Sequence, residues 1–436
     1  MKIPTRCVQI DPFLGRYYAN RSAESIAEEL AVHGFSGVQY IVTRDSRFNR
    51  ELLDALRRRR MHVDYATFGN GTYDTTDLPP GWQEWRMVTR QPVNDGYTRL
   101  CLNHHGYRQW KKAQMVRMLR LHPFDGVHIM EPFFPEYPGP TAPAYGCLCD
   151  RCRNLFAKTG SGEPPPEFND ESHRLFWRNQ PELYARWVEL RAEWHTAFLD
   201  DLVNGEGGIR QSHPRAMVTL WVLAIDTPDP VQFVKEVHGQ DIAELVRRVR
   251  PDMVCLQTHW PDWVKAELPP DYVRAYQPLV RTARAVQPNL PLMIQADIGS
   301  QPQNRRSWDW IGRFRDACNR IGVQSTTLYE YMLGLYQYTD PPRVVKAQRL
   351  PDNVVLLVFN KRLDARNARD KVCYQFTPAV QIQQLEVDGN LVRLRVDRLR
   401  QGRRYRLTVR DISDDPSARW LADTPALTLQ EQTVQV

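Results

Sequence analysis

The stretch HPFDGVHIMEP (122–132) shows an order of residues that returns along most of this chain. Polar and turn-forming residues come first, a short apolar run follows, and a polar residue ends the run. Near-continuous apolar runs of this length are typical of strands that are covered on both faces, as in parallel sheets. The same order occurs in CVQIDPF (7–13), HGFSGVQYIVT (33–43), RRMHVDYATFG (59–69), HPRAMVTLWVLAID (213–226), RPDMVCLQTHW (250–260), NLPLMIQADIG (289–299) and IGVQSTTLYEYM (321–332).

Stretches with helical periodicity separate these eight runs. Strands that alternate with helices predict a parallel sheet, and eight such units predict an α/β fold built on a closed (β/α)8 TIM barrel. A doubly wound open sheet is the alternative, which the count of eight disfavours. The predicted helices are 23–32, 50–60, 107–121, 175–203, 241–249, 272–286 and 307–320.

The pattern changes after Asp340, where helical periodicity ends. Segments such as NVVLLVF (353–359) and RYRLTV (404–409) are short apolar or alternating runs, and Asp388-Gly389-Asn390 is a strong hairpin signal between two of them. We therefore expect residues 1–340 to form the barrel and residues 341–436 to form a β-sandwich of about seven strands. This second part resembles the immunoglobulin-like domains that are appended to bacterial extracellular and carbohydrate-active proteins.

Composition excludes several classes of protein. With 436 residues and 42% hydrophobic content, the chain can bury a large core. Its net charge of +7 is spread along the sequence without a basic tail or an Arg-aromatic motif, so we expect no nucleic-acid partner. The sequence contains no run of about 18 apolar residues, so we expect no membrane-spanning helix. The N-terminus has no apolar signal region, which predicts a cytoplasmic protein, or a secreted one if a signal peptide was removed; a homo-oligomer stays open.

Two long insertions interrupt the barrel pattern, at residues 70–98 and 133–170. Loops longer than about 15 residues in a compact domain are usually functional. The second insertion carries Cys147, Cys149 and Cys152 at C-x-C-x-x-C spacing, and Cys101 lies upstream of the same strand. Four thiolates can complete a tetrahedral site, so we predict a structural zinc ion on these four residues and no organic cofactor. A disulfide within the loop is the alternative.

Polar and aromatic residues gather at the predicted carboxyl ends of the strands, which meet at one face of a barrel. Glu131 is the sharpest case, because an acid directly after the apolar run GVHIM is costly to bury without a purpose. Carboxylates among aromatic rings suit a carbohydrate, since ring faces pack on sugar C–H surfaces and carboxylates bind hydroxyl groups. The predicted substrate-binding residues are Asp11, Tyr40, His104, His105, Trp221, Asp226, His259, Trp260 and Tyr329.

A pair of carboxylates can also cleave a glycosidic bond. We predict Glu131 as the general acid/base, because the flanking residues Pro132, Phe133 and Phe134 would raise its pKa by desolvation. Asp297 or Glu330, at the ends of the last two strands, would provide the opposing carboxylate.

The segment CLCDRCRNLF (147–156), with Cys101 46 residues before it, is similar to the zinc cluster of family 42 β-galactosidases. The resemblance implies a sugar-hydrolysing barrel over residues 1–340, with Glu131 in the place of the proton donor. Two positions depart from that pattern. Met130-Glu131 stands where the family has Asn-Glu, and Asp297 stands where it has a nucleophilic Glu.

Two other functions stay open at this point. A metal-dependent sugar isomerase or epimerase would use Glu131, Asp226, His259 and Glu330 to bind one divalent cation. A glycan-binding barrel without catalysis is the third possibility, because Asp297 replaces the expected Glu.

Overall fold

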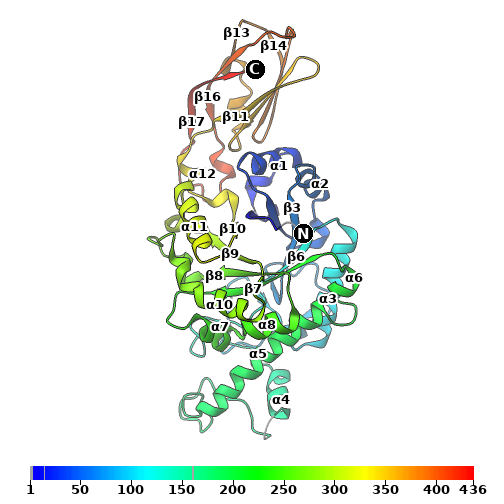
Figure 1. The fold of residues 1–436 in the computed structure, drawn as a ribbon, viewed down its shortest axis with the longest axis vertical. Coiled ribbons are helices and arrows are strands. Elements are labelled where there is room, and N and C mark those ends of the chain that lie inside the picture. Colours follow the sequence, from blue (N-terminus) through cyan, green and yellow to red (C-terminus); the bar gives the residue numbers. More distant parts are fainter. Residues whose placement is uncertain (1–2, 14, 160–161) are drawn as a thin grey trace.

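The computed structural model describes residues 3–13, 15–159 and 162–436, and its larger part is a closed barrel of parallel strands (Figure 1). The strands neighbour one another in the order β1-β10-β9-β8-β7-β6-β3-β2, and β1 and β2 close the ring. Each of the eight sequence runs provides one strand, so the predicted TIM barrel is confirmed. The strands are β1 (Arg6–Ile10), β2 (Gly37–Ile41), β3 (His62–Phe68), β6 (Gly126–Met130), β7 (Met217–Ala224), β8 (Met253–Thr258), β9 (Leu292–Asp297) and β10 (Ser325–Tyr329).

Helices pack around this barrel at the places where periodicity predicted them (Figure 1). Two bounds differ by more than two residues: residues 272–276 form a 3-10 turn before α10, and the long helix begins at Pro181, because proline suits the first helical turn. Among the helices of eight or more residues, two were not predicted, α4 in the cysteine-bearing insertion and α7 after β7. The helices of that length are α1 (Ala23–Val32), α2 (Arg50–Arg58), α3 (His105–Leu121), α4 (Asp150–Lys158), α5 (Pro181–Val203), α7 (Pro230–His238), α8 (Ile242–Val249), α10 (Gln277–Val286) and α11 (Trp308–Arg320).

The interior of the barrel holds a buried polar chain. Trp221 Nε1 donates to His128 Nδ1 over 3.0 Å, which leaves the His128 proton on Nε2, 3.1 Å from Asp64 Oδ2. His62 Nε2 lies 2.8 Å from the other Asp64 oxygen. Burial alone would raise the pKa of Asp64, but the hydrogen bonds from His128 and His62 outweigh it and lower the pKa to about 2.

The C-terminal part consists of two antiparallel sheets with a hydrophobic core of their own, which confirms the predicted β-sandwich. In Figure 1 it lies at the opposite end of the molecule from α4, beyond α1 and α12 (Tyr336–Thr339). The boundary at residue 340 stays a prediction. One sheet holds β11 (Val344–Leu350), β12 (Val354–Phe359), β15 (Leu391–Val396) and β14 (Ile382–Asp388), and the other holds β13 (Tyr374–Thr377), β16 (Arg406–Ser413) and β17 (Thr428–Gln435).

Over the described ranges, no helix is both long and apolar enough to cross a bilayer.

Candidate functional site

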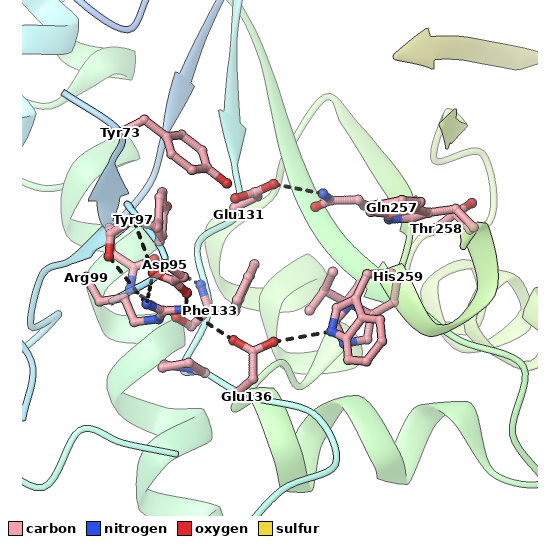
Figure 2. A pocket seen from close by; sticks show the side chains of 15 residues that line it. Tyr73, Asp95, Tyr97, Arg99, Glu131, Phe133, Glu136, Gln257, Thr258 and His259 are labelled. Atoms are coloured by element: carbon pink, nitrogen blue, oxygen red, sulfur yellow. Dashed lines mark hydrogen bonds and ion pairs between the residues drawn. The ribbon is translucent and has the colours of Figure 1, made fainter. Parts of the chain in front are cut away.

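Glu131 directly follows β6 and faces a cavity of about 310 Å³ at the barrel mouth (Figure 2). Its φ of 49° lies in the left-handed region, which costs free energy for a residue with a side chain and is most often kept at functional sites. From β8, Gln257 Nε2 donates a hydrogen bond of 3.0 Å to Glu131 Oε1. The carboxyl is therefore fixed in direction and still accessible from the cavity.

Three segments build the walls of this cavity. The first insertion adds tyrosines and an arginine, the second adds phenylalanine, proline and a glutamate, and the segment after β8 adds a histidine and two tryptophans. Aromatic rings and charged groups thus surround one carboxyl, as Figure 2 shows. The residues that line the cavity include Asn70, Tyr73, Tyr97, Arg99, Glu131, Phe133, Glu136, Gln257, His259, Trp260 and Trp263.

The environment of Glu131 favours its protonated form. Burial raises the pKa of the Glu131 carboxyl, and the neighbouring Glu136 carboxylate adds to the rise. The hydrogen bond from Gln257 and the charge of Arg99 act in the opposite direction. Because desolvation is the largest influence, the Glu131 carboxyl keeps its proton to a higher pH than an exposed glutamic acid does.

Glu136 lies across the cavity from Glu131 and was not predicted. Its carboxylate accepts a hydrogen bond of 3.3 Å from Trp260 Nε1 and pairs with Arg99 Nη2, also at 3.3 Å. Glu136 therefore links the wall from the first insertion to the wall after β8 (Figure 2). Its position in a long insertion, five residues after the strand-end acid, was the available sequence signal.

His259 and Trp260 line the cavity, where the sequence expected them; a role in binding stays a prediction. His259 is 5% exposed, and burial lowers its pKa to about 3, so the ring is neutral. Within the described part of the chain its Nε2 has no hydrogen-bond partner. A buried polar atom without a partner, on a residue that lines a cavity, is suited to a hydroxyl group of a ligand.

Glu330 and Asp11 form a second corner of the mouth, at the junction of β10 and β1. Glu330 Oε1 accepts hydrogen bonds from the Asp11 backbone N–H, over 3.3 Å, and from the Tyr18 hydroxyl. The Glu330 carboxyl is 1% exposed, and burial raises its pKa to about 8, with a contribution from the Asp11 charge. Its Oε2 has no hydrogen-bond partner among the described residues. Tyr329, the preceding residue, is half-buried beside these acids.

Asp297, at the end of β9, is occupied by its own loop. Its Oδ1 accepts from the backbone N–H groups of Gly299 and Ser300 at 2.9 Å and from Asn304 Nδ2 at 3.0 Å. The Ser300 hydroxyl donates to Oδ2. Burial raises the pKa of Asp297 against these donors. With both oxygens engaged, the carboxylate organises the β9 loop.

Seven of the nine predicted substrate-binding residues do not line this cavity. Asp11 and Tyr329 lie in the β1–β10 corner, and the other five lie elsewhere. Tyr40 packs on Phe48 outside the barrel, because side chains alternate along β2. Trp221 is 2% exposed inside the barrel. His104 caps α3, where its Nδ1 accepts from Tyr107 N over 3.4 Å. His105 and Asp226 are exposed outside the cavity.

The four predicted metal-ligating cysteines do converge. The sulfur atoms of Cys101, Cys147, Cys149 and Cys152 all lie within 4.8 Å of one another, and all four cysteines are free of disulfides. Cys101 Sγ lies 3.6 Å from Cys152 Sγ and 3.8 Å from Cys149 Sγ. These spacings fit a tetrahedron around an ion with Zn–S bonds of about 2.3 Å. The donor set therefore fits zinc.

The cation site that an isomerase would need is not formed. Over residues 3–13, 15–159 and 162–436, the cysteine cluster is the only group of three or more candidate ligands that could share one ion. Glu131 and His259 line the cavity, whereas Asp226 is exposed and Glu330 is buried in the β1–β10 corner. The set Glu131, Asp226, His259 and Glu330 is thus not brought together.

Comparison with known proteins places the barrel by its fold. No family model matches the chain, and no curated protein matches it. Among solved structures, it is similar to the glycoside hydrolase domain of PgaB (BpsB) from Bordetella bronchiseptica, at 16% identity and TM-score 0.54, over 74% of this chain and 93% of that one. A variant of Gan42B, a family 42 β-galactosidase from G. stearothermophilus, matches at 15% identity and TM-score 0.52, over 75% of this chain and 51% of the other. A β-galactosidase from Rahnella sp. R3 matches at 13% identity and TM-score 0.50, over 74% and 50%. In fold, residues of the barrel are arranged as in glycoside hydrolases.

Proposed function

We propose that this protein hydrolyses glycosidic bonds, with Glu131 as the general acid. The observation that carries the proposal is the position of Glu131 at a strand end, in a cavity, with a pKa that burial raises. A proton donor to the glycosidic oxygen must stay protonated near neutral pH, and a desolvated carboxyl meets that requirement.

The cavity walls support a sugar as the ligand. Tyr73, Tyr97 and Trp260 offer ring faces to apolar C–H surfaces of a sugar ring. His259 Nε2 and Gln257 Oε1, both buried and without partners among the described residues, offer hydrogen bonds to hydroxyl groups. Glu136 would anchor a further hydroxyl group from its place between Arg99 and Trp260.

For the opposing carboxyl we propose Glu330 in preference to Asp297. Both oxygens of Asp297 are taken by donors of its own loop, whereas Glu330 keeps Oε2 without a partner among the described residues. In the closed ring of eight strands, β10 lies opposite β6, so Glu330 follows the strand that lies across the ring from the strand before Glu131, which supports the pairing. Glu330 would act in its ionised form, which its pKa of about 8 makes more abundant as pH rises above neutral.

The separation of the two carboxyls at the bound sugar would decide the stereochemical outcome. A gap of about 5 Å implies a covalent intermediate and retention, and a gap of about 6.5–9.5 Å leaves room for a water and implies inversion. Proton NMR of the first product anomer distinguishes the two results.

The test is Glu131→Gln, assayed on the nitrophenyl glycoside or oligosaccharide that the wild-type protein cleaves in a screen. Loss of the acid should lower kcat by about 10²- to 10⁴-fold while the folded state is kept, because glutamine has the same shape. Asp226→Asn is the matched control, since Asp226 is exposed and outside the cavity. Circular dichroism and melting temperature check the fold of both variants.

Near-normal turnover by Glu131→Gln would rule out the acid role. A glycan-binding barrel is the second candidate, and the engagement of Asp297 by its own loop favours it. This second function is supported if oligosaccharides bind with equal affinity to the wild-type protein and to Glu131→Gln and neither protein cleaves them.

A further inference from the structure

The β-sandwich holds residues 15–22, which precede α1. Arg362 Nη1 donates to three backbone carbonyls of this segment, those of Arg16 at 3.2 Å, Tyr17 at 2.8 Å and Ala19 at 2.7 Å. The Arg362 backbone N–H also donates to the Tyr17 hydroxyl, over 3.1 Å. One side chain of the sandwich thus fixes a whole turn of the barrel face, because a guanidinium can donate several hydrogen bonds in one plane.

A second anchor is the turn Asp388-Gly389-Asn390, between β14 and β15, which docks on the first turn of α1. Asp388 Oδ1 accepts from Ser22 N at 2.8 Å, and Oδ2 accepts from the Ser22 hydroxyl. Asn390 Oδ1 accepts from Arg21 Nη2 at 3.0 Å and from Ser25 Oγ at 2.9 Å.

Gly389 makes this close approach possible. Its φ is +59°, and a side chain there would meet Ser25 Oγ and Arg21 Nε. The hairpin tip therefore fits the helix end without a gap, with a carboxylate at the positive end of the helix dipole.

Tyr18 lies within the stretch that Arg362 holds, and its side chain reaches into the barrel. The Tyr17 hydroxyl donates a hydrogen bond to Glu29 and accepts one of 3.3 Å from Gln337 Nε2, on the side of the sandwich. The next residue, Tyr18, donates its hydroxyl to Glu330 Oε1 in the barrel mouth. Since the two residues are adjacent on one short 3-10 turn (Arg16–Tyr18), fixing the first also fixes the second.

We propose that the β-sandwich is a fixed brace of the catalytic face, which orders residues 15–22 so that Tyr18 stays bonded to Glu330. Arg362 is then a positioning residue, because it touches neither the cavity nor Glu330. The effect on turnover rests on the proposed function, whereas the ordering of the segment does not.

The first measurement is hydrogen–deuterium exchange of peptides that cover residues 15–22, in the full-length protein. Arg362→Ala should exchange at least about tenfold faster there, since hydrogen-exchange protection follows local opening. Arg362→Lys should restore part of the protection, because an ammonium group can still donate to the carbonyls. Arg366→Ala, an exposed arginine on the same domain, should match the wild-type protein. Unchanged exchange in Arg362→Ala overturns the brace. If that variant does not fold, Asp388→Ala removes the other anchor instead. Faster exchange of residues 15–22 in it supports the brace, and unchanged exchange overturns it.

The second measurement is the split between kcat and KM on the substrate from the glycoside screen. Arg362→Ala should lower kcat by about tenfold or more with KM within about twofold, because misplacement of a reacting group acts on the chemical step while the cavity is intact. Faster exchange with unchanged kcat would overturn the positioning role. A wild-type protein that cleaves no glycoside would overturn the proposed function instead, and the exchange result would still decide the brace.

Discussion

The two acids of the barrel mouth, Glu131 and Glu330, end opposite strands of the same ring and sit in different surroundings. Glu131 faces a cavity whose walls come from two long insertions, and a single side chain, Gln257, directs it. Glu330 is sealed by Tyr18 and the β1 end, behind which the β-sandwich packs.

This difference shows how one fold can place two strand-end carboxyls in separate environments. Burial raises the pKa of both side chains, but only the Glu131 corner leaves open space beside the acid. Insertions build the corner that holds the cavity, and a packed domain builds the rigid one. In barrels generally, variable loops carry specificity over a conserved frame of strands.

The largest expected effect comes from removing the metal site that supports the insertions around the Glu131 cavity. Cys152→Ser should abolish zinc binding, measured as metal per chain by mass spectrometry, and should expose both insertions to limited proteolysis. Structural zinc contributes about 10–16 kcal/mol of apparent binding free energy in small zinc domains, so this loss should exceed the others. The control is Cys373→Ser, a buried cysteine of the sandwich. A wild-type protein that carries no metal as purified, and that melts at the same temperature as Cys152→Ser, would contradict the prediction.

A smaller effect concerns the sealed corner and depends on pH. The Glu330 pKa is about 8 in the folded protein and 4.5 when unperturbed. As pH rises from 4.5 to 8, the unfolded chain loses this proton before the folded one does, so folding stability falls over that window. The glutamine in Glu330→Gln cannot ionise. At pH 8 the free energy of unfolding of this variant should exceed that of the wild-type protein by up to about 5 kcal/mol, with little difference at pH 4.5.

Denaturant unfolding at several pH values checks this result. Parallel stability curves for the two proteins would mean that Glu330 is ionised or hydrated in the folded state, and the contrast between the corners would then be lost.

The smallest expected effect is on ligand affinity at the open corner. Trp260 is 41% exposed and joins the cavity wall through Glu136. Trp260→Ala should weaken glycan binding by about 1–2 kcal/mol, through the lost stacking surface, and should leave stability unchanged. Isothermal titration calorimetry measures it, with Trp420→Ala of the sandwich, 40% exposed, as a control of equal exposure. Equal losses in both variants would show that the effect is not specific to the cavity.

The fold could be predicted almost completely from the sequence. Each barrel strand is an apolar run that ends in a polar residue, and this signal does not depend on contacts elsewhere in the chain. What could not be predicted is the direction of side chains within a strand. Tyr40 and Trp221 both lie within strands, and the register against neighbouring strands and helices decides which face each one occupies.

For the site, the strand-end acids and the four cysteines could be predicted, because strand ends and thiol spacing have a fixed geometry. Glu136 could not, since its place depends on the path of a long insertion. The engagement of Asp297 depends on Ser300 and Asn304, whose directions follow from the loop conformation and not from a local pattern.

The hydrogen bond from Ser22 to Asp388 joins residues 366 positions apart. During synthesis Ser22 leaves the ribosome 366 residues before Asp388, the acid that accepts its hydrogen bonds. The contact that holds the start of α1 to the β-sandwich can thus form only after that stretch has been made, and the β1–β10 pairing likewise joins segments far apart in the sequence. Contacts of such sequence separation slow folding. A shortened chain without the sandwich should therefore be most exposed to proteases and aggregation at its N-terminal end.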